Sequence, residues 1–263
     1  MRVPCCLLLV FAAAGCGDAE YLADFRGNTV PYFEQRQALD AALAAPWQYA
    51  GITLRPPRGF SEVSAPPEPT QEQLEDEYFV PPADPRQPTY LLDPLPGLKG
   101  AWKGPLPGAG EQAGNRWLYV LDSRNLEDDP VAPNLEPDRF VEEVTDRFAR
   151  AMNLPTPELE QFKPMTFPTS SEPFARPVQY RTTPSPLVGE FGDEQIHRVE
   201  LYVYDAGGRK VIVALVMPEE AMIGPEFGEP RDLMLQTLEV GAPTAAPRAG
   251  GGGGGAPAGG PSF

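Results

Sequence analysis

The chain has 263 residues, 41% of them hydrophobic, and carries 37 acidic against 21 basic residues, for a formal charge of −16. This acidity argues against nucleic acid or an anionic lipid surface as a partner, because clustered Lys and Arg are needed to bind either. Since 34 prolines and 26 glycines lie mostly outside the periodic segments, we expect one domain of about 150 to 180 residues.

Residues 1–16 are predicted to be an export signal. Arg2 precedes an apolar run, 5–14, which has the length of a signal-peptide core and falls short of the ~20 residues that span a bilayer. The segment Ala13-Ala14-Gly15-Cys16 resembles the lipobox of bacterial lipoproteins, in which small residues precede a cysteine that receives a diacylglycerol. That resemblance implies cleavage before Cys16 and lipid attachment to it. An ordinary signal-peptidase cut after Ala14 is the alternative.

The exported part of the chain is expected to fold without disulfides. Cys5, Cys6 and Cys16 all lie in the signal segment, so an exported fold forms without cross-links. Two or three acyl chains on Cys16, at ~0.8 kcal/mol per buried CH₂, would anchor the protein permanently. We therefore expect an exported lipoprotein on the periplasmic or cell-surface side of a bacterial membrane. By analogy with lipoprotein sorting, Gly17 in place of Asp favours the outer membrane.

Residues 17–49 are expected to form a tether with a short helix. Asn28-Thr29-Val30-Pro31 supplies a helix start with proline in the first turn, Leu39 and Leu43 share a face, and Pro46 ends the run. Farther along, residues 61–96 are crowded with proline and acid. This stretch is predicted to be a long surface excursion, partly polyproline II.

The domain, residues 50–240, is predicted to be built on one antiparallel sheet. Residues 51–60 are expected to form a strand that the prolines at 56 and 57 end, followed by a turn at Gly59, and the other expected strands are 98–106, 116–123, 176–182, 196–204 and 209–217. Asp205-Ala206-Gly207-Gly208 joins the last two as a hairpin, because its glycines allow positive φ. The run 211–217 is apolar throughout, which predicts a central strand.

Two helices are predicted to pack on this sheet. Residues 137–152 begin with proline and repeat apolar residues every three or four positions, and residues 230–238 carry Leu233, Met234 and Leu238. The predicted fold class is therefore α+β, with one antiparallel sheet, two main helices packed on it and long proline-rich loops. Residues 241–263, which include a run of glycines, are predicted to be a disordered tail.

Three features resemble the PsbP-like fold of small extracytoplasmic and photosystem-extrinsic proteins. They are the turn Pro57-Arg58-Gly59-Phe60, the late central hairpin and the C-terminal helix at residues 230–238. The resemblance spans Gly51 to Val240 and implies a non-enzymatic binding or assembly role. No site residue is carried over from it.

No catalytic motif is evident. His197 is the only histidine and no cysteine follows Cys16, which argues against a zinc site. A serine hydrolase would have to use His197, yet there is no Gly-x-Ser-x-Gly motif. The candidate serines, Ser123, Ser170, Ser171 and Ser185, have ordinary loop contexts. We interpret His197 as a structural residue at a strand end. No glycine-rich segment links a strand to a helix, so no cofactor is expected.

Two further groups of residues are candidate binding sites. Asp122, Glu127, Asp128 and Asp129 are candidate Ca²⁺ ligands, but they lack EF-hand spacing, and a solvated acidic loop is expected instead. The aromatic residues considered for a ligand groove are Trp47, Tyr49, Phe60, Trp102 and Trp117. Trp102 is expected to be the most exposed of them, because glycine and proline flank its strand.

The sequence thus predicts a non-enzymatic envelope lipoprotein that binds or scaffolds another envelope component. The membrane, through Cys16, and another envelope protein are its expected partners, and nucleic acid is not. Two alternatives stay open. One is a secreted hydrolase that uses a pair of carboxylates, and the other is a module that binds a small ligand or Ca²⁺.

Overall fold

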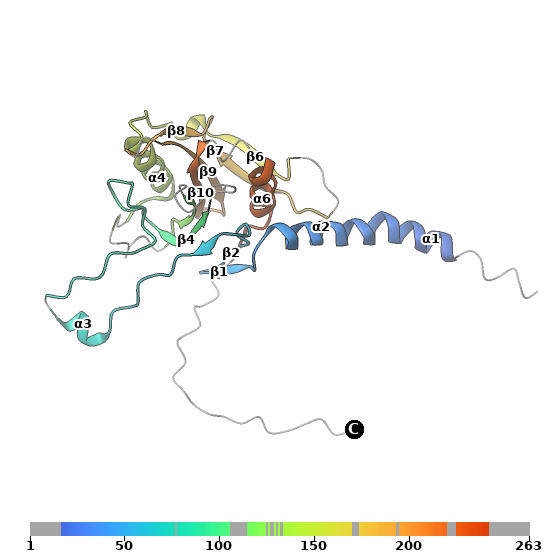
Figure 1. Cartoon of the computed structure of the whole chain (residues 1–263), viewed down its shortest axis with the longest axis horizontal. Coiled ribbons are helices and arrows are strands. Elements are labelled where there is room, and N and C mark those ends of the chain that lie inside the picture. The colour runs from blue at the N-terminus through green and yellow to red at the C-terminus, as the bar shows by residue number, and fades with distance from the viewer. Residues whose placement is uncertain are drawn as a thin grey trace, which may run out of the picture.

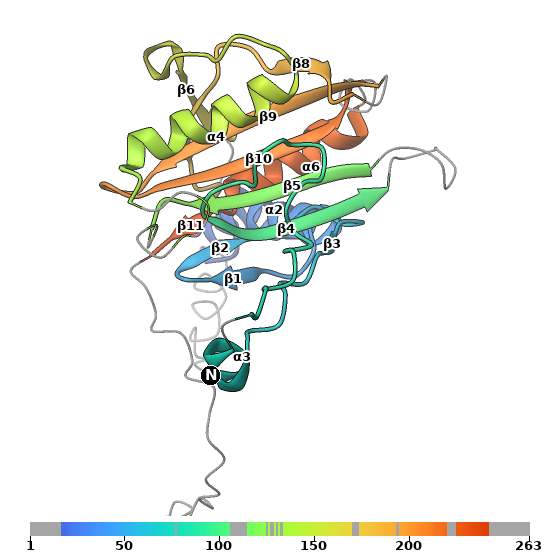
Figure 2. The ribbon, with the colours of Figure 1, turned by 90° about the vertical axis from the view of Figure 1, so that its left-hand side faces the viewer.

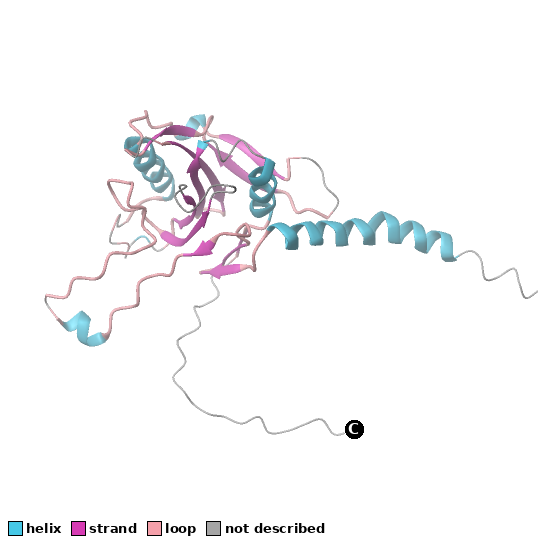
Figure 3. Ribbon diagram, viewed as in Figure 1, coloured by secondary structure: helices cyan, strands magenta, loops and turns pink. Residues whose placement is uncertain are grey.

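The computed structural model describes residues 17–76, 78–105, 115–124, 126, 129, 131, 134–169, 174–192, 195–219 and 225–241. Within them the chain has an α+β fold built on antiparallel sheets, which confirms the predicted fold class. The strands gather at one end of the molecule, and a long N-terminal helix and the segment around α3 (Gln71–Glu75) extend away from them (Figures 1 and 3).

The main sheet has eight strands, all paired antiparallel. They are β3 (Ser61–Glu62), β4 (Leu98–Pro105), β5 (Asn115–Asp122), β6 (Lys163–Phe167), β7 (Val178–Thr182), β8 (Leu187–Glu190), β9 (Ile196–Asp205) and β10 (Lys210–Pro218). Their order is β3-β4-β5-β10-β9-β7-β6, and β8 also pairs with β9. The strands predicted from residue 98 onward are confirmed, and β6 and β8 are additional.

The hairpin of β9 and β10 forms the centre of the sheet, as predicted. All residues from Val211 to Pro218 are buried, since β5 and β9 flank β10 on its two edges. The turn has Gly207 at φ 65° and Gly208 at φ 92°, conformations that a side chain disfavours. The register pairs Ala214 with Leu201.

Helices α4 and α6 cover opposite faces of this sheet (Figure 2). Helix α4 (Pro137–Ala151) buries its apolar stripe, including Phe140 and Phe148, in one core. Helix α6 (Pro225–Gln236) contributes Met234 and Leu235 to the other core. The predicted start of α6 at Pro230 is wrong, because the helix begins at Pro225 and contains Pro230 within it.

A second, three-stranded sheet accompanies the main one. It has the order β1-β2-β11 and comprises β1 (Trp47–Tyr49), β2 (Ile52–Leu54) and β11 (Glu239–Val240). Ile52 and Leu54 are fully buried in the core beneath α6. The strand predicted at the start of 51–60 is β2, and it ends before Pro56 and Pro57 as expected, because proline cannot donate to a ladder.

The proline-rich excursion has two parts. Residues around α3 extend outward, where Thr70 and Gln73 form a capping box. From Asp84 onward the chain returns, and Leu91 and Leu95 join the core beneath α4. The Gln87 side chain donates to the Leu95 carbonyl and accepts from the Leu95 N–H at 3.0 and 2.7 Å, so the second half of the excursion is part of the domain. The short 3₁₀ helix η3 (Leu159–Gln161) precedes β6.

The N-terminal segment is one helical rod that starts earlier than predicted. It consists of α1 (Gly17–Asp24), the π-helical turn η1 (Phe25–Thr29) and α2 (Val30–Ala42). At 1.5 Å per residue these residues span ~39 Å. The C-terminal end of the rod packs on the domain through Leu39 and Ala42, Tyr32 contacts Phe174 edge to face, and no residue of η1 or α2 is buried.

Candidate functional site

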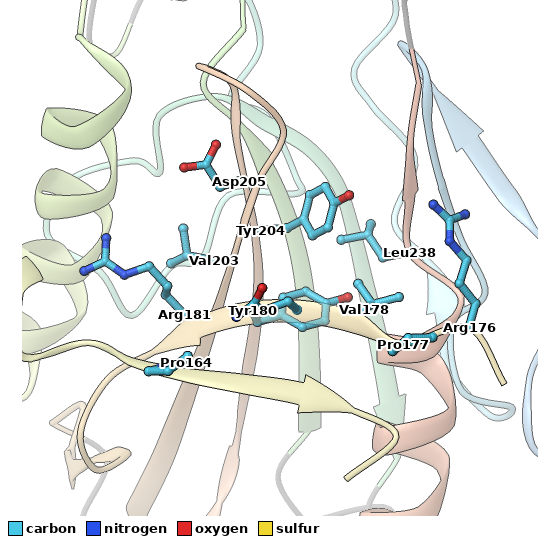
Figure 4. Close-up of a pocket in the computed structure, with 11 residues that line it drawn as sticks. Pro164, Arg176, Pro177, Val178, Tyr180, Arg181, Val203, Tyr204, Asp205 and Leu238 are labelled. Atoms are coloured by element: carbon cyan, nitrogen blue, oxygen red, sulfur yellow. The ribbon is translucent and has the colours of Figure 1, made fainter. Parts of the chain in front are cut away.

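The candidate site is a pocket at the point where β7 separates from β9. The two strands pair only at Arg181 with Val203 and at Thr182 with Tyr202. Toward the start of β7 and the end of β9 no register pair joins them among the described residues. The gap between the two strands forms a pocket of about 640 Å³. Its lining residues are Pro164, Arg176, Pro177, Val178, Gln179, Tyr180, Arg181, Val203, Tyr204, Asp205 and Leu238 (Figure 4).

The lining comes from both faces of the sheet, because the gap lies between two strands. Val203 belongs to the core beneath α4, whereas Val178, Tyr180 and Leu238 belong to the core beneath α6. In Figure 4 the two tyrosines lie between the side chains of Arg181 and Arg176. The pocket therefore combines an aromatic centre with charged ends.

Tyr180 is a firmly held residue of the pocket lining. Its hydroxyl donates to the carbonyl of Leu235 on α6 at 2.7 Å, and its ring meets the edges of Phe167, Tyr202 and Tyr204 at centroid distances of 6.0 Å. Burial, and then the neighbouring hydroxyls of Tyr204 and Tyr202, raise the pKa of Tyr180 well above its usual value. The phenol is therefore neutral at physiological pH.

The charged groups around the pocket already have protein partners. Arg176 pairs with Glu239 at 3.2 Å, and Arg181 donates to the Leu159 carbonyl at 2.5 Å. Asp205 pairs with Lys210, whose hydrogen bond lowers the pKa of that carboxyl. The pocket thus offers shape, aromatic surface and anchored charge, which suit binding. It presents no pair of opposed carboxylates of the kind that glycoside hydrolysis requires, since Asp205 is the one acid in its lining.

A buried ionic cluster lies elsewhere, beneath α6. Glu200, which is 6% exposed, accepts from the Tyr202 hydroxyl at 2.7 Å and pairs with Arg198 and Arg231 at 3.1 Å each. Burial, followed by the charge of Glu200, raises the pKa of Tyr202. Every member of this cluster has a partner, and none lines the pocket between β7 and β9, so it ties α6 to the sheet.

Ser123 and His197, which a serine hydrolase would have to bring together, lie far apart in the structure. The Ser123 hydroxyl accepts from the Lys210 N–H at one end of β10, whereas His197 pairs in register with Pro218 at the other end. At ~3.3 Å per residue these positions are roughly 26 Å apart. His197 is the second residue of β9 and so lies at a strand end, as predicted, with Nδ1 2.9 Å from the Gln195 carbonyl oxygen. Ser185 is an exposed loop residue, and Ser170 and Ser171 lie outside the described residues.

The acidic cluster does not form a metal site within the described residues, where no three His, Cys, Asp or Glu side chains converge on one point. Asp122 is fully buried and bound by Arg209 at 2.7 and 2.8 Å. Asp129 accepts from the backbone N–H groups of Gly97 and Val131 at 2.7 and 2.8 Å. Glu127 and Asp128 lie outside the described residues, as does the lipidation candidate Cys16.

The prediction that Trp102 is the most exposed aromatic residue is wrong. Its side chain is 3% exposed and meets Trp47 edge to face at 5.0 Å between ring centroids. The neighbouring glycine explains the error, because a Cβ at Gly100 would lie 2.6 Å from Cη2 of Trp102. That glycine makes room for the ring instead of exposing it. Tyr49, at 50%, is the exposed member of the set.

The pocket between β7 and β9 was not predicted. The one local signal is Pro177, directly before β7, since proline marks strand starts and edges. In the sequence Arg176 and Arg181 show only a local positive charge, which most often neutralises nearby carboxylates. The partner of Arg176 is indeed a carboxylate, Glu239, but the hydrogen-bond partner of Arg181 is the Leu159 carbonyl.

Comparisons with known proteins give no functional identity. No family model matches the chain, and no curated protein matches it. A crystal structure of a protein from Bacteroides thetaiotaomicron VPI-5482 is similar over 75% of this chain, with 8% sequence identity and a TM-score of 0.35. The chain spans about half of that protein, 48% of its length. Among the described residues, no helix has both the length and the hydropathy to cross a membrane.

Proposed function

We propose that the chain is an exported, lipid-anchored protein of the bacterial cell envelope, held on the membrane through Cys16, and that its domain binds another envelope component without catalysis. The signal and lipobox pattern of residues 1–16 supports the anchor. One observation carries the binding role, namely the pocket of about 640 Å³ between β7 and β9, whose charged groups are anchored and whose centre is aromatic.

The occupant that fits this pocket best is an extended segment of a partner protein. Beyond Val203, the edge of β9 facing the pocket has no strand pair among the described residues, and neither has the inner edge of β7 before Arg181. Open strand edges bind extended chains through backbone hydrogen bonds, and adjacent pockets select the side chains. The partly exposed ring of Tyr204, backed by the buried Tyr180, favours an apolar side chain in the middle of such a segment. Arg176 and Arg181 favour carboxylates toward its ends.

A photo-crosslinking side chain at Gln179 tests the binding role. Gln179 is exposed and lines the pocket, whereas Leu92, 83% exposed, does not line it and serves as the matched control position. In the envelope of the producing bacterium we expect a discrete adduct from position 179 and none from position 92. Mass spectrometry of the adduct should find the contact in an extended segment of the partner. Absence of an adduct at 179, or the same adducts at both positions, would reject the pocket as the binding site.

The anchor has its own test. The intact mass of protein extracted from membranes should correspond to a chain beginning at Cys16 with its acyl groups. A chain beginning at Gly15 without acyl groups would show cleavage after Ala14 instead. Recovery from the cytosol with Met1 attached would overturn both the anchor and the location.

A further inference from the structure

The N-terminal rod carries an unusual density of exposed apolar side chains. Among the described residues, twelve large hydrophobic side chains are exposed, and five of them lie in this rod. They are Tyr21 at 67%, Leu22 at 46%, Phe25 at 40%, Tyr32 at 45% and Phe33 at 59%. Tyr32 contacts Phe174 of the domain edge to face at 5.9 Å. The other four are at least 40% exposed, and the ring contacts of the aromatic ones among them lie within the rod, so far as the described residues go.

Three of these side chains share one face of the rod. Tyr21 and Phe25 are four residues apart and their rings stack at 6.2 Å between centroids. In η1 the Val30 N–H donates to the Phe25 carbonyl, five residues back, so the π turn inserts one residue into the helical repeat. Phe33 therefore takes the place of the seventh residue after Phe25, on the same side. Ala23, two residues before Phe25, lies on the opposite side.

The charge of the rod restricts what can cover this face. Residues 17–42 carry five carboxylates and two guanidinium groups, a net charge of −3. Anionic lipid would repel such a helix. A neutral, zwitterionic headgroup layer suits it, because aromatic rings partition into the interface without a need for positive charge.

The start of the rod places the aromatic face close to the proposed anchor. Gly17, the first helical residue, directly follows Cys16. At 1.5 Å per residue, Tyr21 lies ~6 Å and Phe25 ~12 Å along the axis from Gly17. A lipid on Cys16 would hold both rings at headgroup depth. Because the anchor makes this contact intramolecular in effect, even a weak affinity of each ring for the interface is sufficient.

We propose that the Tyr21, Phe25 and Phe33 face of the rod lies in the zwitterionic headgroup layer of the membrane and so fixes the position of the domain on the bilayer. This inference rests on the proposed anchor at Cys16. It adds a second, non-covalent membrane contact, which turns a flexible attachment into an oriented one.

Spin labels test the inference on the lipidated full-length protein in phosphatidylcholine vesicles. In the processed, acylated chain an introduced cysteine is the sole free thiol, since Cys5 and Cys6 leave with the signal and Cys16 is modified. We compare Phe25→Cys with Ala23→Cys, both exposed positions of the rod. The label at 25 should gain accessibility to oxygen and lose accessibility to a water-soluble nickel complex when vesicles are present. The label at 23 should stay accessible to nickel.

The outcomes separate this inference from the anchor. If the intact mass confirms acylation and both labels stay equally accessible to nickel, the headgroup contact is wrong and the anchor stands. If the label at 25 is protected equally without vesicles, a second copy of the chain covers the face, and the inference is again wrong. If the mass shows no acyl group, the anchor fails and the inference falls with it.

Discussion

Asp122 and Arg209, 87 positions apart in the chain, form a bidentate ion pair with N–O distances of 2.8 and 2.7 Å. The carboxylate is fully buried at the end of β5, and the guanidinium lies beyond the β9–β10 turn. Arg209 also donates to the carbonyls of Ala50 and Gly241. One side chain thus joins the main sheet, the β1–β2 turn and the C-terminal end of the described domain.

Removing either partner of this pair should destabilise the domain strongly. We expect Arg209→Ala to lower the free energy of unfolding by about 3 to 5 kcal/mol, because it leaves the Asp122 carboxylate buried without its counter-charge. Arg176→Ala is the matched control, since its pair with Glu239 is largely exposed and should contribute ~0 to 1 kcal/mol. Urea denaturation measures both. Equal losses in the two variants would contradict the assignment.

Gly97 should tolerate alanine less well than Gly59. Both have positive φ, 61° and 86°, but a Cβ at Gly97 would lie 2.3 Å from the Asp122 carbonyl oxygen, whereas nothing lies within 4 Å at Gly59. Gly59→Ala should therefore cost only the backbone strain, ~1 to 2 kcal/mol, and Gly97→Ala should cost more because β5 must shift. Thermal unfolding of the two variants checks the order. The reverse order would contradict the close approach of Gly97 to β5.

Buried tyrosines predict loss of stability at high pH. Burial raises the pKa of Tyr90, Tyr119, Tyr180 and Tyr202 above the ordinary value of 10.0. Above pH 10 the unfolded chain loses these protons while the folded chain keeps them. The stabilisation is complete below that pH and declines as the pH rises, by ~1.4 kcal/mol per pH unit for each tyrosine.

Denaturant titrations across this pH range, followed together with phenolate absorbance, measure the effect. Tyr90→Phe should reduce the loss of stability per pH unit by the contribution of one tyrosine, because it removes the hydroxyl that is hydrogen-bonded to Tyr119 at 2.9 Å at the edge of the core. The explanation fails if all nine tyrosines of the chain ionise while it is still folded.

Calcium should leave the melting temperature unchanged. Asp122 is committed to Arg209, and Asp129 to two backbone N–H groups, so binding Ca²⁺ at this cluster would first break those contacts. A thermal scan at millimolar Ca²⁺, with Mg²⁺ as the control, measures this. A rise specific to Ca²⁺ would instead favour the Ca²⁺-binding alternative.

The sequence predicted those helices and strands whose residue pattern is contained in one continuous segment. Helix α4 has apolar residues at helical spacing from Phe140 to Phe148, and the β9–β10 hairpin has glycines at its turn, so both were found. The helical spacing of Leu233, Met234 and Leu238 predicted a helix over 230–238, whereas α6 begins at Pro225 and buries Phe227 in the core as well.

The candidate site depends on contacts between distant segments, which explains why the sequence did not reveal it. Whether β7 stays paired with β9 is decided by its other neighbours, since β6 holds Val178 opposite Phe167 and α6 holds the Tyr180 hydroxyl. Neither constraint leaves a pattern near Val178. The β1-β2-β11 sheet likewise forms between the two ends of the domain, and Glu239 and Val240 are too short a run to predict a strand.

The gap between β7 and β9 borders both hydrophobic cores, through Val203 in the core beneath α4 and Tyr180 in the core beneath α6. A segment bound there would complete the hydrogen-bonding ladder across a break in the sheet and would contact both cores. Occupancy should consequently raise the resistance of the whole domain to heat, by an amount that grows with ligand concentration. A simple melting assay can then screen candidate peptides before any crosslinked partner has been identified.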